Sequence, residues 1–347
     1  MKQSIYLGTY TKRESKGVYR ITLDTEKKEL QDLSLVAEVG SPTYLTFDKS
    51  GSILYSVVKV DGEHGGIVSF EKSANGNFNE VDRVIHEGSS PCYVGYDDDR
   101  NLLYTANYHK GQVDVYSSDE KGHLSHLDTV KHSGQSTNEN QDKPHTHYSD
   151  LTPDKKYVIA CDLGTDEVYT YKVDSEGKLV EVSRIKVDAG TGPRHITFHP
   201  NLSVAYVFGE LSSDVIAFHY DSDTGALSPF QTISTIPESH TSFNGGAAIR
   251  VTKDGKFLYA SNRGHDSLAI YSIDQKTGVL ELMEWVSTEG EIPRDFNFDQ
   301  TENFIIVGHQ ESDNLTLFER DVVTGKIILL QKDVYAPEAI CVAILPE

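Results

Sequence analysis

Arginines and histidines recur at two kinds of position along an otherwise acidic chain, and they are the residues best suited to chemistry here. The chain of 347 residues carries 53 acidic side chains against 32 lysines and arginines, a formal net charge of −21 at pH 7. One group of these residues lies in a short sequence segment that recurs along the chain. The other group lies directly after the apolar run that follows each copy of this segment. Guanidinium offers a permanent charge and paired donors, and imidazole can accept a proton near neutral pH. Gathered in one place, they would suit a small anionic ligand.

The repeated phrase sets the spacing of these residues. Gly40–Phe47 reads GSPTYLTF, and related phrases return five times further along the chain. The anchors of the six copies are Pro42, Pro91, Pro144, Pro193, Gly246 and Pro293. They recur every 47 to 53 residues, a period typical of propeller blades or another repeat array.

Each period predicts four short strands. The phrase supplies the first strand. The next three are an apolar run such as Leu102–Asn107, an alternating run such as Gln112–Tyr116, and a run after a glycine turn such as Gly177–Glu181. Such β-rich runs bounded by Gly, Asp, Asn and Ser are strand signals, and no long stretch has helical periodicity. Four antiparallel strands per period make a propeller blade.

The two ends of the chain complete the count of blades. Ser4–Thr9, Gly17–Leu23 and Leu30–Leu35 supply only later strands of a blade, and Pro337–Ile344 supplies a lone first strand. Together they make a last blade, which closes the sheet edges. The sequence therefore predicts an all-β, seven-bladed β-propeller, with residues 1–347 as a single domain. A parallel solenoid would not divide one repeat between the two termini.

The composition of the chain bears on its cellular compartment and on its binding partners. No apolar run approaches bilayer length and the first residues lack a signal-peptide stretch, so we expect a cytoplasmic protein without a membrane partner. The three cysteines, Cys92, Cys161 and Cys341, lie in strand-like contexts, as small buried residues in a reducing compartment would. The strongly negative charge argues against nucleic acid or an anionic membrane as partner.

Blade topology predicts which of these residues meet. In an antiparallel four-stranded blade, the start of the innermost strand and the end of the second strand lie at the same edge, so both groups should surround one mouth of a central channel. The first group is Tyr44, Tyr93, His147, Arg194, Ala247, Arg294 and Glu338. The second group is Thr9–Thr11, Asn107–His109, Asp162, Glu210, Asn262–His265 and His309–Gln310. Two long loops, Lys131–Lys143 and Pro237–Gly245, lead into the same mouth.

Three further phrases resemble a known family. They are Tyr6–Thr11 (YLGTYT), Gly192–Asn201 (GPRHITFHPN) and Ser261–Ser267 (SNRGHDS). They resemble the seven-bladed propeller lactonase family, which includes bacterial 6-phosphogluconolactonases and fungal carboxymuconate cyclases. The resemblance covers essentially the whole chain, and its Pro-Arg-His and Asn-Arg-Gly-His phrases are the specific part.

The resemblance implies a site of four residues: His147, Arg194, Glu210 and Arg263. Opening a lactone requires a base for water and a donor for the oxyanion. We expect His147 or Glu210 as the base, with the choice open, and Arg194 and Arg263 as ligands of a phosphate or of the oxyanion. Further residues expected to bind substrate are His195, Asn262, His265, His309 and Arg294. Strand alternation would turn His195 away from Arg194, so His195 has packing as its alternative role.

Other polar residues have simpler interpretations. We read His123, His126, His132 and His145 as solvated or turn-bonded residues, and Asp97–Asp99 as a solvated turn. Gly190–Gly192 precedes a strand rather than a helix, so it predicts a turn and not a phosphate loop. No cysteine–histidine spacing suggests zinc, and we expect neither a metal nor another cofactor. A calcium site from Glu210, Asp162, Asp295 and Glu338 is possible but not favoured beside the arginines.

The sequence thus predicts a hydrolase of a small anionic sugar lactone, first of all 6-phosphogluconolactone in the pentose phosphate pathway. The alternatives are a hydrolase of a carboxylated lactone, a muconate-type cycloisomerase, and a propeller that binds a ligand without catalysis, because fold alone does not fix function. A Gly-x-Ser-x-Gly elbow is absent, which argues against a serine hydrolase. Neither the oligomeric state nor the need for a metal follows from the sequence.

Overall fold

The structure describes residues 1–346, and over these residues its regular secondary structure consists of β-strands. In the computed structural model, 28 strands form seven four-stranded antiparallel sheets over these residues. The predicted fold class, all-β with four antiparallel strands per blade and seven blades, is confirmed. Within the same residues no helix has the length and apolarity that crossing a membrane requires.

The chain divides into two compact units. The first comprises Met1–Leu102, Ser117–Ser125 and the residues from Thr288 onward, and the second comprises Leu103–Tyr116 and His126–Ser287. A single domain over residues 1–347 therefore stays a prediction, and its last residue, Glu347, lies outside the described residues. Each unit is described by itself below.

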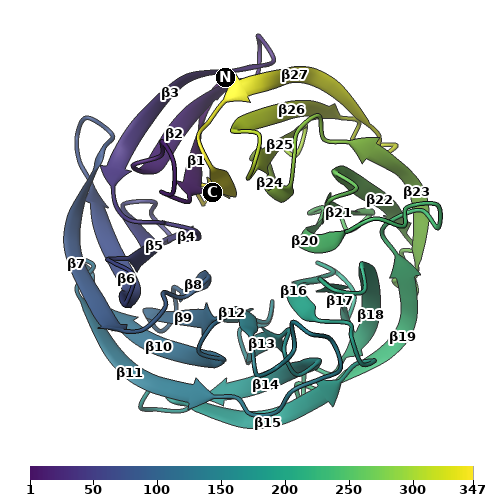
Figure 1. Cartoon of the computed structure of the whole chain (residues 1–347), viewed down its shortest axis with the longest axis horizontal. Helices are drawn as coiled ribbons and strands as arrows, with labels where there is room; N and C mark the ends of the chain where they lie inside the picture. The colour runs from purple at the N-terminus through teal and green to yellow at the C-terminus, as the bar shows by residue number, and fades with distance from the viewer. Residues whose placement is uncertain (347) are drawn as a thin grey trace. The chain divides into compact units, whose positions relative to one another are not determined.

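The first unit contains three complete sheets. They are β28 (Ala339–Ile344), β1 (Lys2–Thr9), β2 (Gly17–Asp24) and β3 (Glu29–Glu38); β4 (Leu45–Phe47), β5 (Ile53–Lys59), β6 (His64–Lys72) and β7 (Phe78–Glu87); and β24 (Pro293–Phe298), β25 (Phe304–His309), β26 (Asn314–Arg320) and β27 (Ile327–Tyr335). In the first of them the C-terminal strand β28 pairs with β1, with Ile5 opposite Ile344 and Leu7 opposite Val342. Figure 1 shows the C-terminus beside β1. The predicted last blade, shared by the two chain ends, is confirmed.

The second unit also contains three complete sheets. They are β12 (Thr146–Leu151), β13 (Val158–Asp162), β14 (Glu167–Val173) and β15 (Leu179–Lys186); β16 (Pro193–Phe198), β17 (Val204–Gly209), β18 (Asp214–Tyr220) and β19 (Leu227–Ser234); and β20 (Gly245–Val251), β21 (Phe257–Arg263), β22 (Ser267–Ile273) and β23 (Leu280–Ser287). The seventh sheet has residues in both units and consists of β8 (Tyr93–Asp97), β9 (Leu102–Asn107), β10 (Gln112–Ser118) and β11 (Leu124–Lys131).

The burial of the strands follows from sheets that pack face to face. The second strand of a sheet, such as β21, is buried along its whole length, whereas the outermost strand, such as β23, is buried only at its first residue and is half-buried or exposed after it. In the second unit, Phe208, Leu258 and Tyr271 come from two neighbouring sheets and share one apolar core. Burying one such side chain contributes about 1.5–3 kcal/mol. This core fixes the edges of the sheets, where the polar residues lie.

A β-bulge interrupts the innermost strand of several sheets at a candidate residue. In β16 the register shifts between Pro193 and His195, so Arg194 is the extra residue. The same shift leaves His147 as the extra residue of β12 and Arg294 as that of β24. A bulge re-aims the side chains beside it. The alternation that would turn His195 away from Arg194 therefore does not hold across this position.

Candidate active site

Two arginines converge on one carboxylate in the second unit. Arg194 comes from the bulge of β16, Glu210 directly follows β17, and Arg263 ends β21. Glu210 Oε2 lies 3.0 Å from Arg194 Nε and 2.8 Å from Arg263 Nη2. The structure thus brings together three of the four residues that the family resemblance implies. They meet because the start of a first strand and the ends of two second strands lie at one edge of adjacent sheets.

Backbone carbonyls hold both guanidinium groups. Arg194 Nη1 donates to Ala247 O at 2.7 Å, while Arg263 donates from Nη2 to Gly246 O at 2.9 Å and from Nε to Gly245 O at 3.3 Å. These three carbonyls lie at the start of β20, where another register shift follows Gly246. Fixed donors of this kind need little reorganisation when charge develops on a ligand.

Gly246 is required at this place by close packing. A Cβ atom there would come within 2.6 Å of Gly209 O and 2.7 Å of the Phe208 ring. Since Gly209 directly precedes Glu210, a larger residue at position 246 would push apart the two segments that bear the carboxylate and its arginines. The close approach of β20 to β17 is therefore part of the construction of the site.

The ion-pair trio of Arg194, Glu210 and Arg263 is largely buried. The exposed fractions of the three side chains are 3%, 20% and 10%, respectively. Two guanidinium groups flank one carboxylate. Guanidinium donors held in this way can also bind a small anion, or an oxyanion that forms during a reaction.

His147 lies in an aromatic cluster next to the trio. Its ring centre is 5.2 Å from that of His195 and 6.1 Å from that of Tyr108, and both histidines are buried. His195 also lies 5.6 Å from Tyr148 and directly follows Arg194 in the chain. His147, the fourth residue of the predicted site, thus contacts the ring of the residue that follows Arg194. The two predicted roles of His195, substrate binding and packing, stay predictions.

Asn262 and His265 lie beside the trio on the segment that contains Arg263. Asn262 is fully buried, accepts from Thr235 Oγ1 at 2.7 Å and donates to Thr235 O at 2.8 Å. His265 is partly exposed, and its Nδ1 lies 2.6 Å from Ser267 Oγ. Burial, together with the nearby charge of His240, lowers the pKa of His265. The contacts of Asn262 fix the preceding loop, and its predicted contact with substrate stays a prediction.

Arg294 and His309 belong to the first unit. Arg294 is half-buried and donates from Nη1 to Gln310 Oε1 at 3.0 Å. His309 is fully buried, with Nδ1 3.1 Å from Asn314 O. Their predicted roles in substrate binding also stay predictions.

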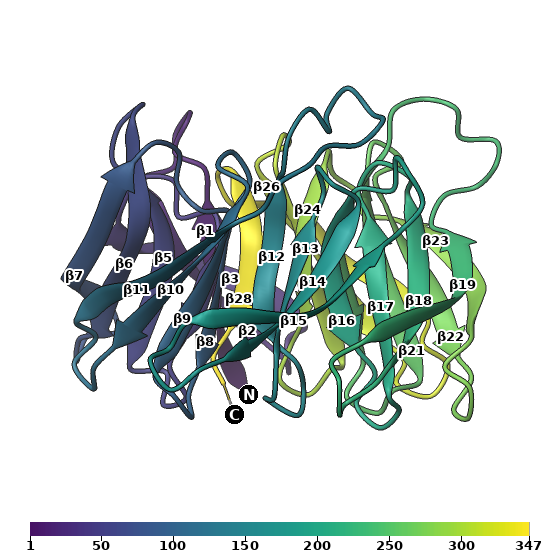
Figure 2. The ribbon, with the colours of Figure 1, turned by 90° about the horizontal axis from the view of Figure 1, so that it is seen from below.

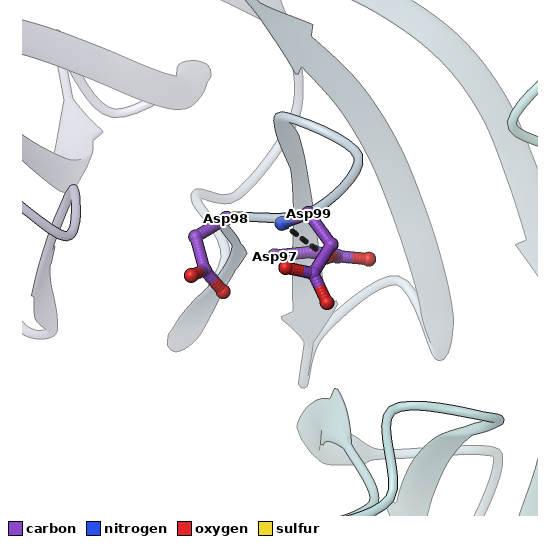
Figure 3. Close-up of side chains that lie close together, drawn as sticks. All are labelled: Asp97, Asp98 and Asp99. Carbon is purple, nitrogen blue, oxygen red and sulfur yellow. Dashed lines mark hydrogen bonds between the residues drawn. The ribbon is translucent and has the colours of Figure 1, made fainter.

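Most of the acids considered for a calcium site are occupied by backbone groups. Asp162 Oδ1 accepts from the N–H groups of residues 145, 164 and 165, and Asp295 Oδ2 accepts from Val342 N at 2.8 Å. Glu338 accepts from the N–H groups of residues 12, 13 and 15. Such carboxylates shape turns, and the same holds for the acidic turn Asp97–Asp99 in Figure 3.

The acidic turn is the one cluster of at least three potential metal-ligand side chains within residues 1–346. Asp97 is fully buried, its Oδ1 accepts from the N–H groups of Asp99 and Arg100, and its Oδ2 lies 2.7 Å from Arg100 Nη1. The inner carboxylate is thus used by its own turn. The predicted turn is present, but the expectation of solvated carboxylates is wrong for Asp97, which is buried and bonded within the turn.

His132 was expected to be solvated or turn-bonded, and that expectation is wrong. Its side chain is 1% exposed, with Nδ1 2.6 Å from Asp162 Oδ2 and Nε2 2.8 Å from Tyr171 Oη. The imidazole stacks on Tyr169 with ring centres 3.8 Å apart. Sequence reasoning missed this residue because its partners lie 30 and 39 positions away, with no motif to connect them.

Comparison with known proteins identifies the family. The model of the family "Lactonase, 7-bladed beta-propeller" matches residues 4–344. The chain belongs to this family, so its fold is the seven-bladed β-propeller and its class is that of lactone-hydrolysing enzymes.

Three similar proteins cover nearly the whole chain. A Bacillus subtilis protein named 6-phosphogluconolactonase is 45% identical over 98% of this chain and 97% of its own. A Lactobacillus plantarum protein of known crystal structure is 45% identical, with a TM-score of 0.96 over 99% of this chain and 100% of that one. The periplasmic gluconolactonase of Pseudomonas aeruginosa is 28% identical, with a TM-score of 0.93 over 99% of each chain.

Proposed function

We propose that this protein hydrolyses 6-phosphogluconolactone to 6-phosphogluconate, a step of the pentose phosphate pathway, in the cytoplasm. The observation that carries the proposal is the largely buried trio of Arg194, Glu210 and Arg263, in which two guanidinium groups flank one carboxylate. A phosphorylated sugar lactone is a small anion whose hydrolysis develops a further negative charge. The name of the Bacillus subtilis relative supports this substrate.

In the proposed mechanism His147 is the base and Glu210 positions the arginines. Glu210 is held between two cations, which stabilise its ionised form and weaken it as a proton acceptor. The imidazole of His147 lies beside the rings of Tyr108 and His195, and an imidazole can accept a proton near neutral pH. We therefore favour His147 over Glu210 for taking the proton of the attacking water.

The reaction then proceeds in two steps. Water loses its proton to His147 as its oxygen adds to the lactone carbonyl carbon, and Arg194 or Arg263 stabilises the oxyanion of the tetrahedral intermediate. When the carbonyl re-forms, the bond to the ring oxygen breaks and His147 returns the proton to that oxygen. A positioned base typically contributes about 10²–10⁴-fold to the rate. An oxyanion donor typically contributes about 10²–10³-fold.

The second candidate is a lactonase for an unphosphorylated or carboxylated lactone, and the Pseudomonas aeruginosa relative named gluconolactonase supports it. A carboxylate would satisfy two guanidinium groups as a phosphate does. A muconate-type cycloisomerase would use the same anion site with a different substrate. A panel of lactones and muconates tested with one enzyme preparation separates these candidates.

The decisive experiment measures loss of freshly generated 6-phosphogluconolactone, with formation of 6-phosphogluconate followed by a dehydrogenase. The wild-type protein should exceed the spontaneous rate, and His147→Ala and Arg194→Ala should lose at least about a hundredfold in kcat. Arg184→Gln is the control, because Arg184 lies in the same unit and pairs with Glu167 and Glu181 away from the trio. A wild-type rate equal to that of buffer would remove the proposal.

A further inference from the structure

Two cations lie over one tyrosine ring in the first unit. Lys12 Nζ is 3.9 Å and Arg294 Cζ is 5.8 Å from the centre of the Tyr10 ring. The face of the ring attracts each cation, while the two positive charges repel each other. An anion that contacts both cations would replace this repulsion with two attractions.

The segment that carries Tyr10 and Lys12 is fixed by a buried carboxylate. Glu338 is 1% exposed and accepts from Lys12 N and Arg13 N at 2.9 Å and from Ser15 N at 3.1 Å. Tyr10 N in turn donates to Glu338 O at 3.2 Å. The backbone under the two side chains is therefore already ordered, which reduces the entropy lost when a ligand binds.

Neighbouring charges are neutralised, but those of Lys12 and Arg294 are not. Arg13 Nη2 lies 2.8 Å from Asp313 Oδ1, and Arg13 Nη1 lies 3.4 Å from a carboxylate oxygen of Glu311. Throughout residues 1–346, in contrast, no carboxylate forms an ion pair with Lys12 or Arg294. A guanidinium group has five N–H donors, and Arg294 uses one of them on Gln310.

Arg294 also occupies a position that the fold uses repeatedly. It is the extra residue of the bulge in β24, just as His147 and Arg194 are the extra residues in β12 and β16. The bulge presents these three side chains in equivalent places on their own sheets. Arg294 is thus the equivalent, in the first unit, of residues that contribute to the candidate active site of the second.

We propose that Tyr10, Lys12 and Arg294 form an anion-binding site in the first unit, suited to a phosphate group. Phosphate offers oxygens for the paired donors of a guanidinium and for the point charge of an ammonium. The phosphate has two possible sources, free inorganic phosphate and the phosphate group of a sugar lactone. Only the second source rests on the function proposed above.

The test is a calorimetric titration of the full-length protein with inorganic phosphate. Arg294→Gln and Lys12→Gln should each weaken phosphate binding by about tenfold or more, while Arg194→Gln leaves a binding component that Arg294→Gln removes. Arg184→Gln is the matched control, since Arg184 Cζ lies 5.0 Å from the Tyr169 ring centre but pairs with two carboxylates. Unchanged phosphate binding in Arg294→Gln, or binding lost only in Arg194→Gln, would overturn the proposal.

Kinetic measurements with two lactones, one phosphorylated and one not, distinguish the two sources of phosphate. If the site holds the phosphate of the substrate, Arg294→Gln raises KM about tenfold for 6-phosphogluconolactone and leaves KM for gluconolactone unchanged. If the site holds free phosphate, the variant loses phosphate binding with both KM values unchanged. Absence of any lactone turnover would remove the proposed function, whereas the phosphate titration would still decide the anion site.

Discussion

Two long loops of the second unit precede candidate site residues, and they are built in opposite ways. Loop 132–145 leads to His147, and loop 235–244 leads to the carbonyls that hold the two arginines. Figure 2 shows both loops extending from the same side of the second unit. The first is anchored by buried polar side chains along its length, whereas the second is anchored at its ends and exposes its tip.

Loop 132–145 is attached to the sheets through two buried aspartates. Asp162 holds His132, and Asp166 Oδ1 accepts from Gln141 Nε2 at 2.7 Å. Asp166 also accepts from Gly190 N at 2.8 Å and Gly192 N at 2.7 Å. Since Gly192 lies just before the strand of Arg194, one carboxylate positions the segments ahead of both His147 and Arg194.

Loop 235–244 has polar anchors at its two ends only. Thr235 Oγ1 donates to Ser213 O at 2.7 Å, and Asn244 Nδ2 donates to Ser213 Oγ at 2.8 Å. Between them Phe243 is 71% exposed, an uncommon place for a large aromatic side chain. The contrast indicates that loop 132–145 holds the side of the site with the proposed base, His147, in a fixed position. Loop 235–244, next to Arg263, is held less firmly between its ends.

The largest effect should come from cutting the anchor of loop 132–145. Asp166→Ala leaves the N–H groups of Gly190 and Gly192 without their acceptor, and it removes one of the two acceptors of the Gln141 amide. We expect a loss of about 3 kcal/mol or more in the free energy of unfolding, measured by urea denaturation, since each buried donor left unpaired costs about 1–3 kcal/mol. The control is Asp188→Ala, an exposed carboxylate nearby, which should change stability by less than about 0.5 kcal/mol. Equal stabilities of the two variants would contradict the anchoring role.

A smaller effect is expected at His132, with a separate signature in the kinetics. His132→Ala removes the bonds to Asp162 and Tyr171 and should cost about 1–3 kcal/mol in stability. Because loop 132–145 leads directly into His147, kcat for the lactone should fall more than KM rises. His132→Asn keeps a donor toward Asp162 and should recover part of kcat. A loss of stability with kcat unchanged would make His132 purely structural.

The repeat explains how much of this site could be predicted from the sequence. A period of about fifty residues indicates four strands per blade, and strand polarity then assigns Arg194, Glu210 and Arg263 to one edge. Their ion pairs follow from that placement. The bulge at Arg194 could not be predicted, since nothing local distinguishes it from regular pairing, and it overrode the alternation expected for His195.

Burial of polar residues was the less predictable part. His132 stands in a stretch rich in Ser, Gln and Asn, which favours an exposed loop, yet Asp162 and Tyr171 enclose it. Asn262 lies fully buried with hydrogen bonds to Thr235, which no motif in the sequence indicates. Both outcomes depend on which loop folds back over which strand end, and a single sequence carries no signal for that long-range choice.

At Phe243 we expect a change in KM without a change in stability. The ring lies against Gly245, where a Cβ atom would be 3.5 Å from Phe243 Cζ, and the carbonyl of Gly245 holds Arg263. Phe243→Ala should raise KM for the lactone a few-fold and alter the free energy of unfolding by less than about 0.5 kcal/mol, since the side chain is exposed. Val180→Ala, an exposed apolar residue on β15, is the control. A Phe243 variant with the stability loss of a core residue would show that loop 235–244 is as firmly packed as loop 132–145.

The smallest effect should be a pH dependence at the contact between loop 235–244 and His265. The His240 and His265 rings meet edge to face with centres 5.0 Å apart, and burial followed by the charge of His240 lowers the pKa of His265, against a small opposing effect of Asp266. A histidine whose pKa is lower in the folded state binds more protons when unfolded, so its contribution destabilises the fold as pH falls below the unfolded value of about 6.5. His240→Gln removes one cause and should raise the pKa of His265 toward its ordinary value, followed by NMR titration of the histidine Cε1–H signals. Because His132 lies in the other loop, its signal should be unaffected by this substitution. A shift of the His132 signal as large as that of His265 would mean that the two loops respond together, and the contrast between them would fail.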